Sequence, residues 1–158
     1  MRNIKITRTI IESTLGALYR INKKNKSMSD TELEKYKSYY FLLCKWLLIR
    51  EHGLSIEMML LKDNKTRIAI YGFRELGEAL YDELKESKIS VEFIIDRNPS
   101  YIISTVDIYR PEENYPDVDA IIVTPIYDYY SIKEQMSRRT SIPIISLGEI
   151  VEKLYVKI

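Results

Sequence analysis

The sequence predicts an α/β protein in which five parallel strands, in the order 3-2-1-4-5, follow a small helical region. Short runs of apolar, mostly β-branched residues alternate with helical patterns after residue 64, and such alternation is typical of parallel sheets with right-handed crossovers. The runs are almost continuously apolar, as in strands that are covered on both faces. The expected strands are RIAIY (67–71), VEFII (91–95), AIIVT (120–124) and IPIIS (142–146), with a weaker one, TVDIY, at 105–109.

Residues 1–64 are predicted to form the helical region. Apolar residues recur at helical spacing in three segments, and Ser29 and Glu32 have the spacing of a capping box at the start of the second. The expected helices span about 4–22, 30–52 and 55–62. The pattern changes at the polar sequence KDNK, so residues 65–158 are predicted to form the sheet domain.

Three further helices are expected within the sheet domain, because amphipathic segments separate or follow its strands. Ser146 and Glu149 again have the spacing of a capping box. The expected helices span about 75–87, 126–138 and 148–156.

Composition and charge narrow the classes of function. The formal net charge is +1, and no patch combines basic residues with base-reading or stacking residues, so we expect no nucleic-acid partner. Cys44 is the sole cysteine, which fits a reducing compartment. The most apolar stretch, 39–49, is shorter than the about 20 residues that span a bilayer, and the N-terminus lacks the apolar core of a signal peptide. We expect a cytoplasmic protein without a transmembrane segment.

The helical region is the predicted contact surface. Segment 39–49 is apolar almost all round, so more than one of its sides should be covered. A homodimer through Leu43, Trp46 and Leu47, or a partner enzyme, would cover it, and so would a core within the chain. Residues 1–26 carry seven Lys and Arg against one acid. They form either a solvated helix face or a peripheral contact with an anionic membrane surface.

The loop after the first strand carries part of a dinucleotide-binding fingerprint, G-x-G-x-x-G. Gly72 and Gly77 occupy the first and third glycine positions, where glycine allows a tight turn and close packing of helix on strand. Phe73 and Arg74 lie between them, and Arg74 stands where the middle glycine lets a pyrophosphate approach the backbone. Its side chain either blocks a dinucleotide or pairs with a phosphate.

Further candidate residues end the second and fourth strands. Asp96 is at the distance expected for the acid that bonds ribose hydroxyls. Arg97 either meets an adenine or a 2′-phosphate or is an exposed loop charge. Thr124 and Pro125 lie at the switch point of the sheet, where ligands bind, or else form the N-cap and first residue of a helix. The predicted nucleotide-binding residues are Gly72, Phe73, Arg74, Gly77, Asp96, Arg97, Thr124 and Pro125.

Four segments carry a family resemblance: IAIYGFRELGEALYDEL, VEFIIDRNPS, DAIIVTPIYDYYSIKEQM and IPIISLGEIVEKL. They resemble Rossmann-like domains that accompany bacterial surface-polysaccharide and sugar-modifying enzymes, as separate chains or fused to transferases. The resemblance covers about residues 66–155, and IDRNP and VTPI are its most telling pieces. It implies NAD(P) or a nucleotide-sugar as the ligand, with Gly72, Gly77 and Asp96 matching the binding pattern. The middle glycine usual in that group is absent here.

No residues stand out as catalytic. The pattern Y-x-x-x-K occurs three times, but chance alone gives about one match, so the motif is a weak signal. A single histidine and a single cysteine leave no zinc site and no catalytic triad. A dehydrogenase of this architecture would also need a substrate domain with an acid–base pair. We therefore expect an accessory, non-catalytic nucleotide-binding module linked to bacterial surface-polysaccharide biosynthesis. The alternatives are an NAD(P)-dependent nucleotide-sugar reductase or epimerase, and a scaffold whose nucleotide site is degenerate and empty.

Overall fold

The computed structural model describes residues 29–158. Within these residues, 38–158 form one compact unit. The expected helix at about 4–22 lies outside the described residues, as does the basic segment 1–26 with its predicted membrane contact. Within residues 29–158, none of the helices combines the length and the apolar character needed to cross a bilayer.

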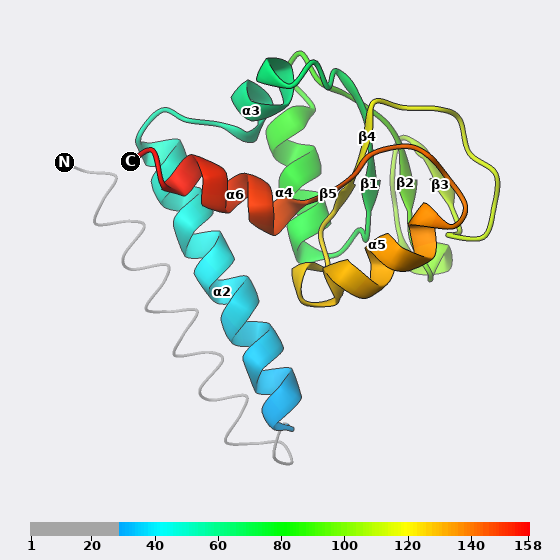
Figure 1. Cartoon of the computed structure of the whole chain (residues 1–158), viewed down its shortest axis with the longest axis horizontal. Coiled ribbons are helices and arrows are strands. Elements are labelled where there is room, and N and C mark those ends of the chain that lie inside the picture. Colours follow the sequence, from blue (N-terminus) through cyan, green and yellow to red (C-terminus); the bar gives the residue numbers. More distant parts are fainter. Residues whose placement is uncertain (1–28) are drawn as a thin grey trace. The chain divides into compact units, whose positions relative to one another are not determined.

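Five parallel strands form one sheet in the order β3-β2-β1-β4-β5, which confirms the predicted fold class (Figure 1). At the carboxyl end of β1, Tyr71 pairs with Ile95 of β2 on one side and with Val123 of β4 on the other. The chain therefore adds strands on one side of β1 first and then on the other. The switch point of the sheet lies at the carboxyl end of β1, between β1 and β4. The strands are β1 (Arg67–Tyr71), β2 (Ser90–Ile95), β3 (Asp107–Tyr109), β4 (Ala120–Val123) and β5 (Ile144–Ser146).

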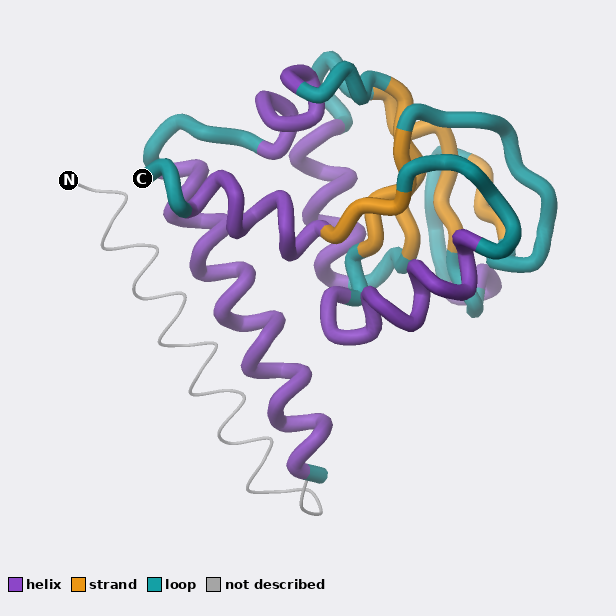
Figure 2. Tube along the Cα trace, in the orientation of Figure 1, coloured by secondary structure: helices purple, strands orange, loops and turns teal. Residues whose placement is uncertain are grey.

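Helices precede, connect and follow the strands, as Figure 2 shows. The helix expected at 126–138 begins with a separate 3₁₀ turn, and the strands at both edges of the sheet are shorter than expected. Pro143, which lacks an N–H group, shortens the start of β5. The helices are α2 (Asp30–Glu51), α3 (Ile56–Lys62), α4 (Glu75–Leu84), η1 (Pro99–Tyr101), η2 (Ile126–Asp128), α5 (Tyr129–Ser137) and α6 (Leu147–Tyr155).

Two of the predicted helix caps are present. The Ser29 hydroxyl accepts the Glu32 amide at 3.3 Å while the Glu32 carboxylate accepts the Ser29 amide at 3.1 Å, so this capping box is complete. The Ser146 hydroxyl accepts the Glu149 amide at 3.4 Å at the start of α6.

The sheet is covered on both faces, as the continuous apolar runs predict. Ile68 and Ile70 of β1 belong to one core, together with buried residues of α2, α3, α4 and α6. Ala69 and Tyr71, on the opposite face of the same strand, belong to a second core with α5. The sheet is therefore the middle layer, with α2, α3, α4 and α6 on one face and α5 on the other (Figure 1).

The second half of α2 is part of the first core. Its residues Leu42, Trp46 and Ile49 are buried, and the Trp46 indole N–H donates to a Glu83 carboxylate oxygen of α4 at 2.6 Å. The prediction that Trp46 contacts a second copy of the chain is wrong, because its side chain is only 4% exposed. The predicted domain boundary between residues 64 and 65 falls in the connection from α3 to β1.

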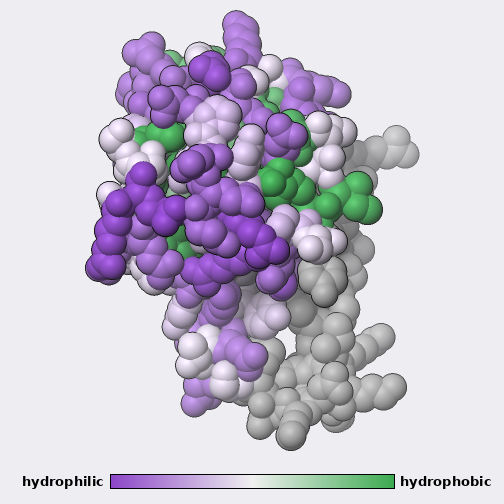
Figure 3. All heavy atoms as spheres, turned by 90° about the vertical axis from the view of Figure 1, so that its right-hand side faces the viewer, coloured by the Kyte–Doolittle hydropathy of each residue, from purple (hydrophilic) through white to green (hydrophobic). Residues whose placement is uncertain are grey.

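The outer surface near β3 and α5 is mostly hydrophilic. In the view of Figure 3, apolar residues form only small, separate patches between polar side chains. This surface shows no broad apolar area of the kind that marks a protein–protein interface.

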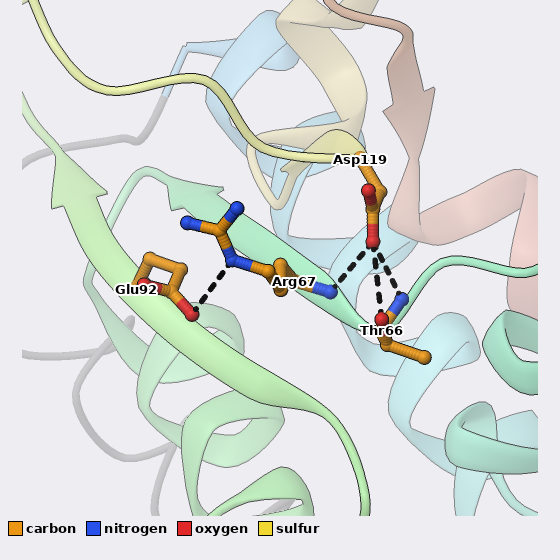
Figure 4. A network of polar contacts seen from close by, with 4 residues as sticks. All are labelled: Thr66, Arg67, Glu92 and Asp119. Carbon is orange, nitrogen blue, oxygen red and sulfur yellow. Dashed lines mark hydrogen bonds and ion pairs between the residues drawn. The ribbon is translucent and has the colours of Figure 1, made fainter.

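A network of polar contacts joins the amino ends of three strands (Figure 4). One Asp119 carboxylate oxygen accepts the backbone amides of Thr66 and Arg67, each at 2.8 Å. The Arg67 guanidinium forms an ion pair with Glu92 of β2 at 3.3 Å. The amides of Arg67 and Thr66 hold the pKa of Asp119 below its ordinary value of 3.8, because they stabilise the charged form.

Acid should remove the contribution of Asp119 to stability. Its pKa is lower in the folded chain than in the unfolded one, so its carboxylate stabilises the fold above the ordinary value, and this contribution is lost as pH falls through the folded pKa. We expect Asp119→Asn to lower the unfolding temperature at pH 7, and the difference from the parent to shrink below pH 3.8. Thermal unfolding at several pH values measures it, with the exposed Asp117→Asn as control. A difference that stays constant with pH would contradict the assignment.

Candidate functional site

The loop between β1 and α4 is shaped by its two glycines. Gly72 has a φ of +85°, in the left-handed region that favours glycine, and a Cβ there would lie 2.7 Å from two ring carbons of Pro125. A Cβ on Gly77 would lie 2.2 Å from the Gly72 carbonyl oxygen, so α4 starts in direct contact with the loop. The tight turn at Gly72 and the close packing at Gly77, for which glycine was expected, are both confirmed.

Arg74 replaces the middle glycine without backbone strain. Its φ of −106° and ψ of −155° are extended, a conformation that any residue adopts. The side chain is exposed, and its guanidinium has no hydrogen bond or ion pair with any residue of the described range 29–158. The guanidinium is therefore available to an anion at this loop.

Asp96 is fixed at the end of β2 by two backbone amides. One carboxylate oxygen accepts the Phe73 amide at 2.9 Å and the other accepts the Asn98 amide at 2.8 Å. The first bond joins the end of β2 to the loop after β1, and the second closes the turn that follows β2. The carboxylate is half-buried, so these two loops hold it in place while leaving it accessible.

Thr124 and Pro125 hold the same loop from the β4 side. The buried Thr124 hydroxyl donates to the Gly72 carbonyl oxygen at 2.7 Å, and the Tyr71 carbonyl oxygen lies 3.2 Å away. The alternative interpretation of Thr124 as a helix N-cap is wrong, because Pro125 is the residue that precedes η2. The Thr124 hydroxyl therefore links β4 to the glycine turn.

An open cavity of about 330 Å³ lies beside this loop, at the carboxyl ends of β1 and β2. Its volume is at the lower end of the range, about 300–1,000 Å³, that is typical of small-molecule sites. Arg74 is the only cationic residue among those that line the cavity, and three of the other lining residues are acidic. The cavity is lined by Phe73, Arg74, Glu75, Glu78, Asp96, Asn98 and Ile102.

The structure brings together some of the predicted binding residues and not others. Phe73, Arg74 and Asp96 line the cavity, and Gly72, Gly77, Thr124 and Pro125 shape the loop next to it. Arg97 is exposed and lies outside the lining. Four lining residues were not predicted from the sequence. Two lie in the first turn of α4 and two lie between β2 and β3, and these positions near the predicted loop could have pointed to them. They are Glu75, Glu78, Asn98 and Ile102.

The tyrosines of two Y-x-x-x-K pairs are engaged in structural contacts. The Tyr129 hydroxyl donates to the Ile144 carbonyl oxygen of β5 at 3.1 Å. The Tyr81 hydroxyl lies 2.8 Å from the Thr105 hydroxyl, and Lys85 pairs with Asp82 at 2.9 Å. The third pair, Tyr19 and Lys23, lies outside the described residues.

Metal ligands are not grouped in the described part of the chain: no three His, Cys, Asp or Glu side chains of residues 29–158 lie where they could hold a metal ion. Comparison with known proteins found no matching family model, no matching curated protein and no matching solved structure. The geometry of the cavity is therefore the basis for a functional proposal.

Proposed function

We propose that the sheet domain is a non-catalytic module that binds a nucleotide through its ribonucleoside part. The position of Asp96 carries this proposal. An ionised carboxylate offers about four acceptor sites, and the amides of Phe73 and Asn98 occupy one site on each oxygen. Each oxygen therefore keeps acceptor capacity for a hydroxyl, and two adjacent hydroxyls are what a ribose presents.

The surroundings of Asp96 support a nucleoside ligand. Open parallel sheets bind ligands at the carboxyl ends of their strands, where the strand order reverses, and the cavity lies at the carboxyl ends of β1 and β2, next to that point. Phe73 and Ile102 contribute apolar lining, and Asn98 contributes a polar side chain, a mixture that is typical of small-molecule sites. NAD(P) and nucleotide-sugars, the ligands implied by the family resemblance, both contain a ribonucleoside.

The residues around the cavity support binding more than catalysis. Its titratable lining residues are carboxylates and one arginine, and His52 lies elsewhere, with its Nδ1 at 2.8 Å from the Leu48 carbonyl oxygen at the end of α2. A carboxylate can act as the general acid or base of a reductase or epimerase, but two backbone amides hold Asp96 as a fixed acceptor, and Glu75 and Glu78 are exposed. We accordingly keep enzymatic activity as the alternative, and an accessory role in surface-polysaccharide biosynthesis as the proposal that follows from the resemblance.

Thermal unfolding of the full chain with NAD, NADP, UDP-sugars, CDP-sugars and the free nucleosides tests the proposal. A ligand that binds only the folded chain stabilises it by about 2.7 kcal/mol at a hundredfold excess over Kd. We expect a saturable rise with at least one of these compounds, and its loss in Asp96→Asn. Asp107→Asn, which removes an exposed carboxylate from β3, is the matched control and should keep the rise. The absence of any shift would favour the scaffold with an empty site.

An accessory module needs a partner, and we propose α2 as the contact with a second copy or a partner enzyme. Phe41 is 60% exposed, and Leu43, Leu47 and Leu48 are each more than a third exposed. The mass of the purified chain in solution distinguishes a homodimer from a monomer that requires a different partner.

A further inference from the structure

We infer that the cavity prefers a ribonucleoside carrying one phosphate and discriminates against nucleoside diphosphates. This inference rests on the proposed function, because it concerns the same cavity. It follows from the charges that line the cavity, from the backbone amides that are already used, and from the position of Arg74.

The first turn of α4 already carries its own negative charges. Glu75 and Glu78 both line the cavity there. The amino end of a helix attracts anions through its dipole and its unpaired amides. Here the first turn of α4 itself carries two acidic residues, which add negative charge beside the position that a phosphate would take. With Asp96 included, the cavity has three carboxylates against one guanidinium.

Two amides of the loop are already used within the chain. The Gly72 amide donates to the Ile95 carbonyl oxygen at 2.8 Å, and the Phe73 amide donates to Asp96 at 2.9 Å. Both donors are thus committed to contacts within the chain. At the third position, Arg74 places a side chain where a glycine would let a pyrophosphate reach the backbone.

Arg74 supplies the counter-ion for one phosphate. A guanidinium pairs with a phosphate through charge-assisted hydrogen bonds, and the Arg74 side chain lines the cavity without a partner in the described range 29–158. A second phosphate would bring further negative charge close to Glu75 and Glu78 with no second cation to offset it. Diphosphate ligands, including NAD and nucleotide-sugars, should therefore bind less tightly than the matching nucleoside monophosphate.

Titration calorimetry with nucleoside, nucleoside monophosphate and nucleoside diphosphate, for each of the four ribonucleosides, measures this discrimination. For the base that binds, we expect the diphosphate to have about fivefold weaker affinity than the monophosphate, the size expected for two partly solvated like-charge pairs. Added salt should narrow this difference, because it screens the repulsion. Arg74→Gln should reduce the affinity for the monophosphate to that for the nucleoside.

The double variant Glu75→Gln, Glu78→Gln should bring the diphosphate to within about twofold of the monophosphate, because both repulsive pairs are gone. Glu86→Gln removes an exposed carboxylate just beyond the other end of α4 and should leave the difference unchanged. A parent chain that binds the diphosphate or NAD more tightly than the monophosphate would overturn the inference and leave the proposed function standing. If none of the nucleosides or nucleotides binds, both are overturned.

Discussion

Replacing Gly77 with alanine is expected to lower the free energy of unfolding by about 2 kcal/mol, within the range of about 1–3 kcal/mol typical of overpacking. The added Cβ would lie 2.2 Å from the Gly72 carbonyl oxygen. That oxygen belongs to the backbone and also accepts the Thr124 hydroxyl, so it has little freedom to move. The start of α4 must shift away from β1, although alanine favours the helix by up to about 1 kcal/mol.

Gly148→Ala is the matched control for this prediction, because Gly148 also lies in the first turn of a helix that follows a strand. A Cβ there would lie 3.3 Å from side-chain atoms of Ile126 and Ser146 rather than against backbone. Denaturant unfolding of both variants gives the two free energies. The close approach of α4 to the loop would be contradicted if Gly77→Ala cost no more stability than Gly148→Ala.

The same variant bears on the candidate site. A shifted α4 moves Glu75 and Glu78 relative to Asp96, whose position is fixed by the Phe73 amide. In a folded Gly77→Ala chain, the ligand should therefore raise the unfolding temperature less than it does in the parent chain. The reduction should exceed what the lower stability of the variant alone would cause. Fold and ligand binding depend here on one contact between a helix and a turn.

The sheet could be predicted because each strand has a local cause in the sequence. Strand β1 is a continuous apolar run bounded by polar residues and Gly72, and the structure gives it the expected bounds, 67–71. The edge strands β3 and β5 were expected to be longer. They are paired on one side only, so apolar character alone does not extend them, and Pro143 shortens the start of β5.

The candidate site could be predicted only in part, for a similar reason. Gly72 and Gly77 have local causes, a positive φ and a close approach, that select glycine. The bond from Thr124 to the Gly72 carbonyl depends on how β1 and β4 are aligned, which a single sequence does not show. The side of α4 that faces the cavity likewise depends on packing, so Glu75 and Glu78 were not among the predicted site residues.

Replacing Trp46 with alanine should cost about 3–5 kcal/mol of unfolding free energy, the typical loss for a buried tryptophan. The side chain is 4% exposed in the core that α2 shares with the sheet. Helical periodicity could not predict that Trp46 is buried, because segment 39–49 of α2 is apolar almost all round and does not indicate which side faces the core. The loss should include the hydrogen bond from the indole N–H to Glu83.

Glu83 of α4 connects Trp46 to a further helix through its two carboxylate oxygens. Its second carboxylate oxygen accepts the amide of Ile56 at 2.9 Å, the first residue of α3, so one side chain of α4 joins α2 and α3 to the sheet domain. Trp46→Phe should cost about 1–3 kcal/mol less than Trp46→Ala, because it keeps most of the apolar volume and loses the hydrogen bond.

Met58→Ala is the control, since Met58 lies in the neighbouring helix α3 and is 49% exposed. It should change the free energy of unfolding by no more than about 0.5 kcal/mol, as surface substitutions usually do. If Trp46→Ala and Met58→Ala cost the same, α2 would not belong to the core of the sheet. If Trp46→Ala unfolds the sheet cooperatively with α2, the second half of the helical region is part of the folding unit that carries the candidate nucleotide site.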